Sequence, residues 1–142
     1  MTYRLRALGA SDVTELEQVR QFFRNYAAWL GVDFSYQGSA DEVANLPGAY
    51  GEAGGRLFFV EMDGVPCGCV GVRRFSEGVC EMKRLYVDPE MRGRGLGRQL
   101  ALAAIKAAQE LGYRRILLDT LPAMRIAMKL YRELGFSEAP AY

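Results

Sequence analysis

LYVDPEMRGRGLGRQLALAA, residues 85–104, is the stretch that carries most of the information about the fold. A short apolar run ends in arginines that alternate with glycines, and an alanine-rich helical pattern follows directly. Glycine lets backbone N–H groups approach a ligand closely, a helix N-terminus carries partial positive charge, and arginine adds a full charge with forked donors. Between a strand and a helix, this combination predicts a binding site for an anion, and a phosphate fits it best.

Length and composition predict one globular domain that spans residues 1–142. The length suits one hydrophobic core rather than two, and 50% of the residues are hydrophobic whereas 25% are charged. The 18 basic and 17 acidic residues leave a net charge of +1, which argues against a broadly basic nucleic-acid surface. We therefore expect no nucleic-acid partner and a positive charge that is local, at Arg92, Arg94 and Arg98.

The three cysteines, Cys67, Cys69 and Cys80, predict a reducing environment. Their number is odd, and the sequence shows neither a signal-peptide pattern nor an apolar run long enough to cross a bilayer. A cytoplasmic protein without membrane contact is therefore expected. The sequence contains no histidine, which removes the usual partner of a zinc-binding or nucleophilic cysteine and the usual general base. We expect the cysteines to pack in the core and no metal to be bound.

Hydrophobic periodicity and turn residues predict the order strand, helix, long loop, three antiparallel strands, helix, strand, helix, strand. The predicted strands cover residues 3–7, two runs within 56–75 that meet at Asp63 and Gly64, 79–87, 114–120 and 136–142. The predicted helices run from Ser11 or Asp12 to Gly31 and over residues 41–46, 95–111 and 123–135. This order is typical of an α/β (α+β) domain, in which a mixed, mostly antiparallel sheet carries helices on both faces.

The strand predicted at 79–87 contains a break in its alternation of apolar residues. Cys80 and Met82 are apolar at one phase, Leu85 and Val87 are apolar at the other, and two polar residues separate the pairs. A slip of the buried phase by one residue predicts a β-bulge, although a strand buried on both faces gives the same pattern. A bulge here would free backbone groups beside the anion site to pair with an extended, amide-bearing ligand.

Three phosphate-binding patterns can be compared with the anion site. A P-loop requires G-x-x-x-x-G-K-[ST], which the sequence lacks. A dinucleotide-binding turn is closer, because Gly95 and Gly97 open a helix. Asp119 follows Gly97 at a spacing close to the ~20 residues expected of an acid that binds the ribose. Leu100, however, stands at the third glycine position, and a long loop replaces the tight turn of that fold. A dinucleotide-binding module is therefore the weaker alternative.

The third pattern is RGRGLG at residues 92–97, which matches the [Q/R]-x-x-G-x-[G/A] pyrophosphate loop of the GCN5-related N-acetyltransferase (GNAT) superfamily. CEMKRLYVDPEMRGRGLGRQL, residues 80–100, is similar to that superfamily's central bulged strand, loop and helix, and AMKLYRELGF, residues 127–136, resembles its closing signature. The resemblance implies an acetyl-CoA-dependent N-acetyltransferase that acts on a primary amine of a small molecule or a protein by direct attack in a ternary complex. A catalytically idle acyl-CoA-binding sensor is the alternative.

The resemblance also assigns residues to the cofactor. Backbone N–H groups from Arg94 to Arg98 would hold the pyrophosphate, and the nearby arginine side chains would add charge. Backbone groups of a three-residue segment in the bulged strand would pair with pantetheine as if it were an added strand. The expected cofactor-binding residues are Leu85, Tyr86, Val87, Arg92, Gly93, Arg94, Gly95, Leu96, Gly97 and Arg98.

The resemblance places three groups at the chemistry. Tyr131 would protonate the departing CoA thiolate, and a packed core tyrosine is the alternative. Glu81 would accept the amine proton directly or through water, or it would form an ion pair with a neighbouring residue or strand. The backbone N–H of Leu85 would meet the oxyanion. No acyl-enzyme is expected, because packing explains Cys80 better. Met124 departs from the family pattern, since many members carry asparagine there.

The acceptor pocket is expected along the loop Val32–Gly55, because the cofactor is assigned to the C-terminal half of the chain. Acidic and aromatic side chains together would suit a small cationic amine, although packing or solvation would explain each of them as well. The residues concerned are Phe34, Tyr36, Gln37, Asp41, Glu42 and Tyr50. The sequence leaves open which amine is the acceptor and whether the protein forms a homodimer.

Overall fold

A computed structural model describes residues 2–30, 45–51, 53–118 and 125–137 of the chain. The strands are β1 (Tyr3–Ala7), β2 (Arg56–Met62), β3 (Val65–Ser76), β4 (Val79–Val87) and β5 (Arg115–Leu117). The helices are α1 (Val13–Leu30), α3 (Leu96–Glu110) and α4 (Arg125–Glu133), with short 3₁₀ helices η2 (Gly48–Gly51) and η3 (Pro89–Met91). Element order thus follows the sequence prediction through α4.

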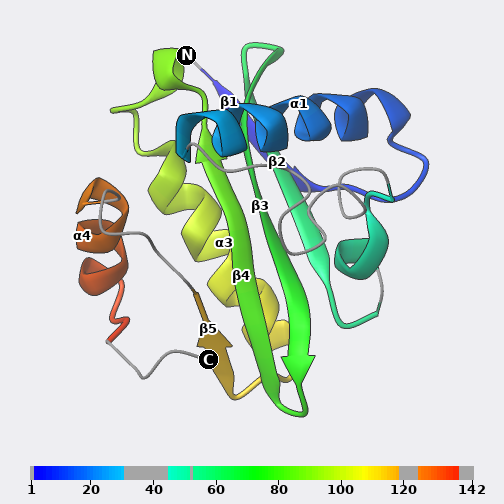
Figure 1. Cartoon of the computed structure of the whole chain (residues 1–142), viewed down its shortest axis with the longest axis vertical. Coiled ribbons are helices and arrows are strands. Elements are labelled where there is room, and N and C mark those ends of the chain that lie inside the picture. Colours follow the sequence, from blue (N-terminus) through cyan, green and yellow to red (C-terminus); the bar gives the residue numbers. More distant parts are fainter. Residues whose placement is uncertain (1, 31–44, 52, 119–124, 138–142) are drawn as a thin grey trace.

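The five strands form one mixed sheet in the order β1-β2-β3-β4-β5 (Figure 1). Neighbours from β1 to β4 are antiparallel, whereas β5 runs parallel to β4. The β2–β3 hairpin turns at Asp63 and Gly64, whose φ angles of 50° and 82° are those of the tight two-residue turn expected for Asp-Gly. The predicted mixed, mostly antiparallel sheet is confirmed.

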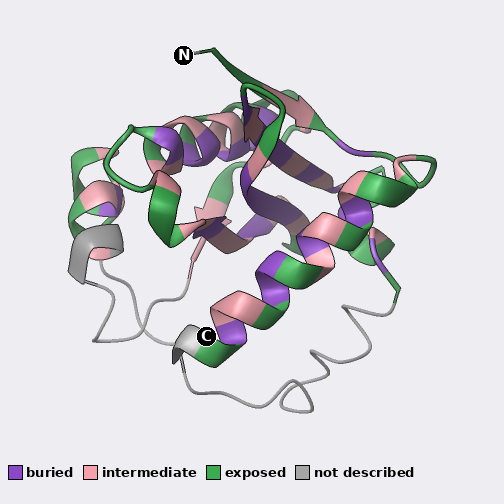
Figure 2. Ribbon diagram, turned by 90° about the horizontal axis from the view of Figure 1, so that it is seen from above, coloured by how far each residue is buried: buried purple, intermediate pink, exposed green. Residues whose placement is uncertain are grey.

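Helices cover both faces of the sheet, with α1 on one face and α3 and α4 on the other (Figure 2). Alternate residues of β2 supply the two cores: Leu57 and Phe59 pack toward α1, and Val60 and Met62 pack toward α3. The strand period of two therefore divides one hydrophobic segment between two apolar clusters. Each fully buried large side chain contributes about 1.5–3 kcal/mol to folding, so both faces are needed for stability.

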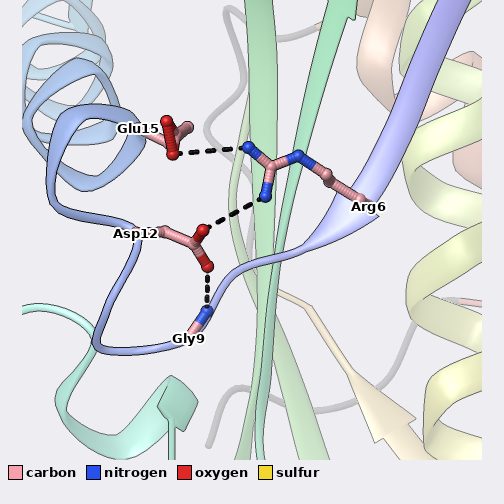
Figure 3. Close-up of polar contacts among 4 residues, drawn as sticks. All are labelled: Arg6, Gly9, Asp12 and Glu15. Carbon is pink, nitrogen blue, oxygen red and sulfur yellow. Dashed lines mark hydrogen bonds and ion pairs between the residues drawn. The ribbon is translucent and has the colours of Figure 1, made fainter.

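An ion-pair network fixes the N-terminus of α1 against the end of β1 (Figure 3). The guanidinium of Arg6 lies 3.3 Å from a carboxylate oxygen of Asp12 and 3.3 Å from one of Glu15. Asp12 also accepts a 2.7 Å hydrogen bond from the backbone N–H of Gly9. That hydrogen bond, followed by the charge of Arg6, lowers the pKa of Asp12. The predicted helix start is confirmed, with Asp12 as the residue before Val13.

Two predicted elements are not observed in the residues that the structure describes. Of the helix predicted at 41–46, only residues 45 and 46 are described, and they lie in a turn. Leu46 precedes Pro47, and a residue before proline disfavours the helical region because of the proline ring. Of the strand predicted at 136–142, Phe136 and Ser137 are described and are not in a strand. The remaining residues of both predictions lie outside the described residues.

Candidate functional site: an open strand edge beside a helix end

The edge of β4 that faces away from β3 is paired only at its beginning. Here β5 pairs with Val79, Cys80 and Glu81. Between Met82 and Val87, no strand of the described part of the chain pairs with this edge. The sheet therefore presents backbone N–H and C=O groups of β4 in the gap beyond the end of β5.

A β-bulge lies in the middle of this open segment. Cys69 pairs with Tyr86 and Gly71 pairs with Lys83, so one residue of β3 opposes two residues of β4, Arg84 and Leu85. The backbone of Arg84 is left-handed, with φ of 61°. As a result, the apolar residues before and after the bulge pack against the same cluster on the α3 face, namely Cys80, Met82, Leu85 and Val87. The predicted bulge is confirmed.

The end of β4 directs its backbone groups into the gap. The N–H of Asp88 donates to the carbonyl of Cys67 at 2.8 Å. Because hydrogen-bonded and non-hydrogen-bonded pairs alternate in an antiparallel ladder, Val87 turns its own N–H and C=O away from β3. The Nε of Arg92 donates to this Val87 carbonyl at 3.0 Å, and its guanidinium carbon lies 6.0 Å from the ring centroid of Tyr86. Arg92 therefore lies over the end of the open edge.

The loop between β4 and α3, residues 88–95, lies next to the open edge and is called the anion loop. Gly93 and Gly95 are exposed and adopt φ angles of 81° and 79°, and a Cβ atom at either position would meet nothing within 4 Å. Gly95 caps α3 without a side-chain hydrogen bond, and the first turn holds no acidic residue. The first N–H groups of a helix have no partner within the helix. This helix end is therefore suited to an external anion.

The two remaining arginines near the anion site, Arg94 in the loop and Arg98 in α3, are placed differently from one another. Arg98 forms an ion pair with Glu133 of α4 at 2.7 Å, and both side chains are nearly half exposed. Arg94 is exposed, and its charge is felt by the thiol of Cys67. The ion pair connects the first turn of α3 to α4, so it holds α4 next to the anion loop.

Tyr131 of α4 is buried, with 6% of its surface exposed. It belongs to the apolar cluster against which Leu85 and Val87 pack, and its ring lies 5.9 Å from that of Phe136. Burial raises the pKa of Tyr131, with a smaller contribution from Tyr26 of α1. Tyr131 therefore lies in the apolar cluster on the α3 face of the sheet, which also contacts Leu85 and Val87 of the open edge.

Glu81 is buried, with 6% exposure, and lies on the α1 face of the sheet because its neighbours in β4 point to the α3 face. Its carboxylate lies 3.3 Å from the Nε of Arg73, the residue directly opposite on β3. The structure therefore contains an ion pair between Glu81 and the neighbouring strand, which is one of the contacts expected for this residue from the sequence. Sequence reasoning missed Arg73 as the partner, because an extra residue in β3 between Arg74 and Ser76 shifts the register there.

Tyr50 is the one residue predicted for the acceptor wall that the structure describes. It is buried, and its ring lies so close over Gly71 that a Cβ at that glycine would come within 2.5 Å of it. Tyr50 therefore covers the α1 face of the sheet between Glu81 and the bulge. The other residues predicted for this wall lie outside the described part of the chain: Phe34, Tyr36, Gln37, Asp41 and Glu42. Met124, the position that departs from the family pattern, also lies outside it.

The three cysteines are buried free thiols, which confirms the packing prediction. Burial raises the pKa of Cys80 to about 11, and it also raises the pKa values of Cys67 and Cys69. Since the thiolate is the reactive form, none of these groups is set up as a nucleophile at neutral pH. Across the described ranges, no group of three or more potential ligands is arranged to hold a metal ion. No helix within those ranges is both long and apolar enough to cross a membrane.

Comparison with known proteins relates the whole arrangement to one family. The sequence profile of the acetyltransferase (GNAT) family matches residues 16–136. An uncharacterised N-acetyltransferase of Schizosaccharomyces pombe is 37% identical over 130 residues, which cover 90% of this chain and 80% of that protein. The uncharacterised N-acetyltransferase YjgM of Escherichia coli is 31% identical over 136 residues, which cover 93% of this chain and 80% of that protein.

Solved structures share the fold. A GNAT-family acetyltransferase from Staphylococcus aureus superposes with a TM-score of 0.83 at 19% identity, covering 98% of this chain and 87% of that one. AAC(6')-Iy in complex with the bisubstrate analogue CoA-S-monomethyl-acetylneamine superposes with a TM-score of 0.74 at 23% identity, covering 100% of this chain and 95% of that one. At these identities the likeness establishes the architecture alone.

Proposed function

The chain belongs to the acetyltransferase (GNAT) family and is an acyltransferase, and from this premise we propose that it transfers the acetyl group of acetyl-CoA to a primary amine by direct attack in a ternary complex. The observation that carries the proposal is the continuity between two features, the open edge of β4 and the uncapped N-terminus of α3. An extended, amide-bearing chain that ends in a pyrophosphate matches both in one ligand.

Two features of the described residues support acetyl-CoA as the ligand. First, the space next to Gly93 and Gly95 at the start of α3 is open, and a side chain at either position would project into it. Second, Leu85, Tyr86 and Val87 offer a strand edge for the pantetheine amides. When bound, acetyl-CoA supplies an activated acetyl thioester. The Val87 carbonyl already accepts a hydrogen bond from Arg92, and because a carbonyl oxygen has two lone pairs, a pantetheine amide would either share this oxygen with Arg92 or replace it.

Three groups of the chain would then act on the reacting atoms. The N–H of Leu85 would donate to the acetyl carbonyl oxygen as it gains negative charge. Tyr131 would protonate the departing thiolate, and its raised pKa keeps the phenol protonated at neutral pH. Glu81 would accept the amine proton. Because its carboxylate is buried and already contacts Arg73, the proton would reach it through a bridging water rather than by direct contact with the amine. The raised pKa of Cys80 supports transfer without an acyl-enzyme.

The proposal also covers the boundaries of the domain and its location in the cell. Residues 1–142 would form one N-acetyltransferase domain that works in the cytoplasm. The family match over residues 16–136 supports the first statement, and three cysteines that are all free thiols support the second.

The test is a calorimetric titration of the purified protein with acetyl-CoA, CoA and NAD, followed by an assay of thiol release against a panel of amines. We expect the CoA compounds to bind, NAD not to bind, and thiol to be released with at least one amine. Binding of acetyl-CoA without turnover on any amine would identify an idle sensor instead. Binding of NAD in place of CoA would overturn the interpretation of the anion loop.

A further inference from the structure

Arg98 and Glu133 form an ion pair that the ends of their own helices disfavour. Arg98 lies in the first turn of α3, where the helix end carries partial positive charge, and Glu133 is the last residue of α4, where the partial charge is negative. The helix dipole would stabilise either residue at the opposite end of its helix. Residues that break such a local rule are expected at functional sites, so this pair indicates a role beyond helix stability.

The pair joins the start of α3 to the helix that carries Tyr131. Nη2 of Arg98 lies 2.7 Å from Oε2 of Glu133. The two helices also meet at Gly97, where a Cβ atom would lie 3.8 Å from the side chain of Leu130. Contacts with the first turn of α3, where the anion loop ends, therefore hold the end of α4 in place.

Two backbone amides just beyond Glu133 report how firmly this end of α4 is held. The N–H groups of Leu134 and Phe136 donate to the carbonyl of Tyr131 at 3.2 and 3.0 Å. Both side chains are half-buried and pack against the apolar cluster on the α3 face. Helix ends open locally without unfolding of the whole protein, and exchange of their amides with solvent measures this opening.

Arg98 faces a second anion under the proposed function. It is one of the residues assigned to the pyrophosphate, and it lies in the helix turn that the pyrophosphate would meet. The side chains of Arg98 and Glu133 are 44% and 46% exposed, so phosphate oxygens have access to the guanidinium. Exposed ion pairs are weak, whereas phosphate accepts paired, charge-assisted hydrogen bonds from arginine. The cofactor and Glu133 would therefore compete for one cation.

We propose that Glu133 is an internal counter-ion of Arg98 that the phosphates of the cofactor displace, so that cofactor binding at the anion loop loosens the C-terminal end of α4. This inference rests on the proposed function and adds a residue that controls its cofactor site. The coupling is reciprocal: the phosphates weaken the ion pair, and the ion pair weakens phosphate binding by the same factor. Because affinity differences of this kind lie mostly in the dissociation rate, Glu133 favours the release of CoA after the transfer.

The first measurement is calorimetric titration of CoA at low ionic strength into the native protein, Glu133→Gln, Arg98→Met and the double variant. We expect Glu133→Gln to bind CoA about 2- to 5-fold more tightly than the native protein, the range of an exposed ion pair. In the Arg98→Met background the same substitution should leave the affinity unchanged, because the cation for which Glu133 competes is gone. Both substitutions change exposed side chains, so the variants are expected to fold.

The matched control is Glu110→Gln. Glu110 is the last residue of α3 and pairs with Lys106 at 3.9 Å, so this variant also removes a glutamate at the end of a helix from an exposed ion pair. It should leave the affinity for CoA unchanged. A gain equal to that of Glu133→Gln would show that any lost negative charge favours CoA, and it would overturn the inference.

The second measurement is hydrogen exchange at Leu134 and Phe136, resolved by NMR. CoA and inorganic pyrophosphate should each raise the exchange rates of these amides about 2- to 5-fold in the native protein, the same factor as in the affinities. In Arg98→Met the rates should be raised without ligand and should not rise further. Pyrophosphate separates the effect of the phosphates from that of contacts made by the rest of CoA.

The outcomes separate this inference from the proposed function. Equal or weaker binding of CoA by Glu133→Gln, or an equal gain with and without Arg98, would overturn the competition and leave the acetyltransferase standing. Unchanged exchange at both amides in native protein saturated with CoA would overturn the link to α4. Failure of the native protein to bind CoA would remove the proposed function itself, and the inference with it.

Discussion

The two long helices of this protein begin in opposite ways. The N-terminus of α1 carries its own carboxylates, Asp12 and Glu15, and Arg6 holds both in place (Figure 3). The N-terminus of α3 begins at Gly95 with no side-chain cap and no acid in its first turn. Both helix ends present the same partial positive charge and the same unbonded type of N–H group.

The difference teaches how one physical feature serves two purposes. At α1 the partial positive charge of the helix end faces carboxylates of the chain itself, so the helix end contributes to stability. At α3 the first turn contains no acidic residue, and under the proposed function the complementary charge comes from the pyrophosphate of the ligand. We therefore expect a carboxylate placed at α3 to act as an internal competitor of the cofactor, and a carboxylate removed from α1 to affect folding alone.

The largest effect is expected for Gly95→Asp, which would make the start of α3 resemble that of α1. Aspartate tolerates the left-handed backbone of Gly95 better than most residues do, so the fold should persist at a modest cost in stability. Its charge, however, would meet the pyrophosphate, and like charges held together cost several kcal/mol. Affinity for acetyl-CoA, measured by calorimetry, should fall about 100-fold or more.

The matched control is Gly95→Asn, which has the same shape without the charge. It should weaken acetyl-CoA binding about tenfold at most, since it adds bulk alone to an open site. Similar losses for both variants would show that bulk rather than charge is excluded there. Full affinity in Gly95→Asp would mean that the pyrophosphate binds elsewhere.

Tyr131→Phe separates binding at the helix end from chemistry beside it. We expect kcat to fall about tenfold, the lower range for a lost general acid, with KM for acetyl-CoA nearly unchanged. Because burial raises the pKa of Tyr131, the phenol should stay protonated through its ordinary pKa of about 10, and kcat should show no alkaline loss from this group below that pH.

Tyr113→Phe is the control for the loss of a phenol that is partly buried and hydrogen-bonded. Its hydroxyl donates to the carbonyl of Gly54, away from the open edge, so its removal should lower stability and leave kcat unchanged. If Tyr131→Phe also left kcat unchanged, water would be the proton donor and Tyr131 a packing residue.

Arg98→Met tests how far side-chain charge assists the helix end. Arg98 is exposed and paired with Glu133, so solvent and its partner already screen its charge. We expect acetyl-CoA affinity to fall about 2- to 5-fold, and the difference to shrink in high salt. Glu133→Gln, which removes the competing charge, should bind at least as tightly as the native protein. A loss as large as that in Gly95→Asp would mean that side chains rather than backbone groups hold the pyrophosphate.

Local patterns predicted the fold because they are set by near neighbours. The Asp63-Gly64 turn follows from the positive φ that both residues tolerate, and the bulge follows from the slip in apolar phase between Met82 and Leu85. The glycines of the anion loop likewise mark positions where the backbone itself would contact the ligand. These features need no knowledge of the remaining chain.

Contacts across strands were harder to predict, because irregularities shift them. Counting across the turn between β3 and β4 would pair Glu81 with Arg74, but the extra residue at Phe75 gives Arg73 instead. No local pattern indicates that Arg92 reaches back to the Val87 carbonyl or that Arg84 stacks on Phe23. Such contacts depend on where α1 and the loop come to lie after folding.

The smallest effect, confined to stability, is expected for Asp12→Asn at the other helix end. The pKa of Asp12 is lowered in the folded protein, so its charge stabilises the fold above its ordinary pKa of about 4, and this contribution is lost as the pH falls through the folded value. Thermal unfolding should therefore show a lower midpoint for Asp12→Asn at pH 7, and a smaller difference from the native protein once the pH is low enough to protonate Asp12 in the folded state. Glu110→Gln, which removes an exposed carboxylate, should change neither. Acetyl-CoA affinity should equal that of the native protein, because α1 keeps its charge balance for the fold alone. An equal loss of stability at both pH values would instead assign Asp12 a role through shape rather than charge, and the contrast between the two helix ends would then rest on α3 only.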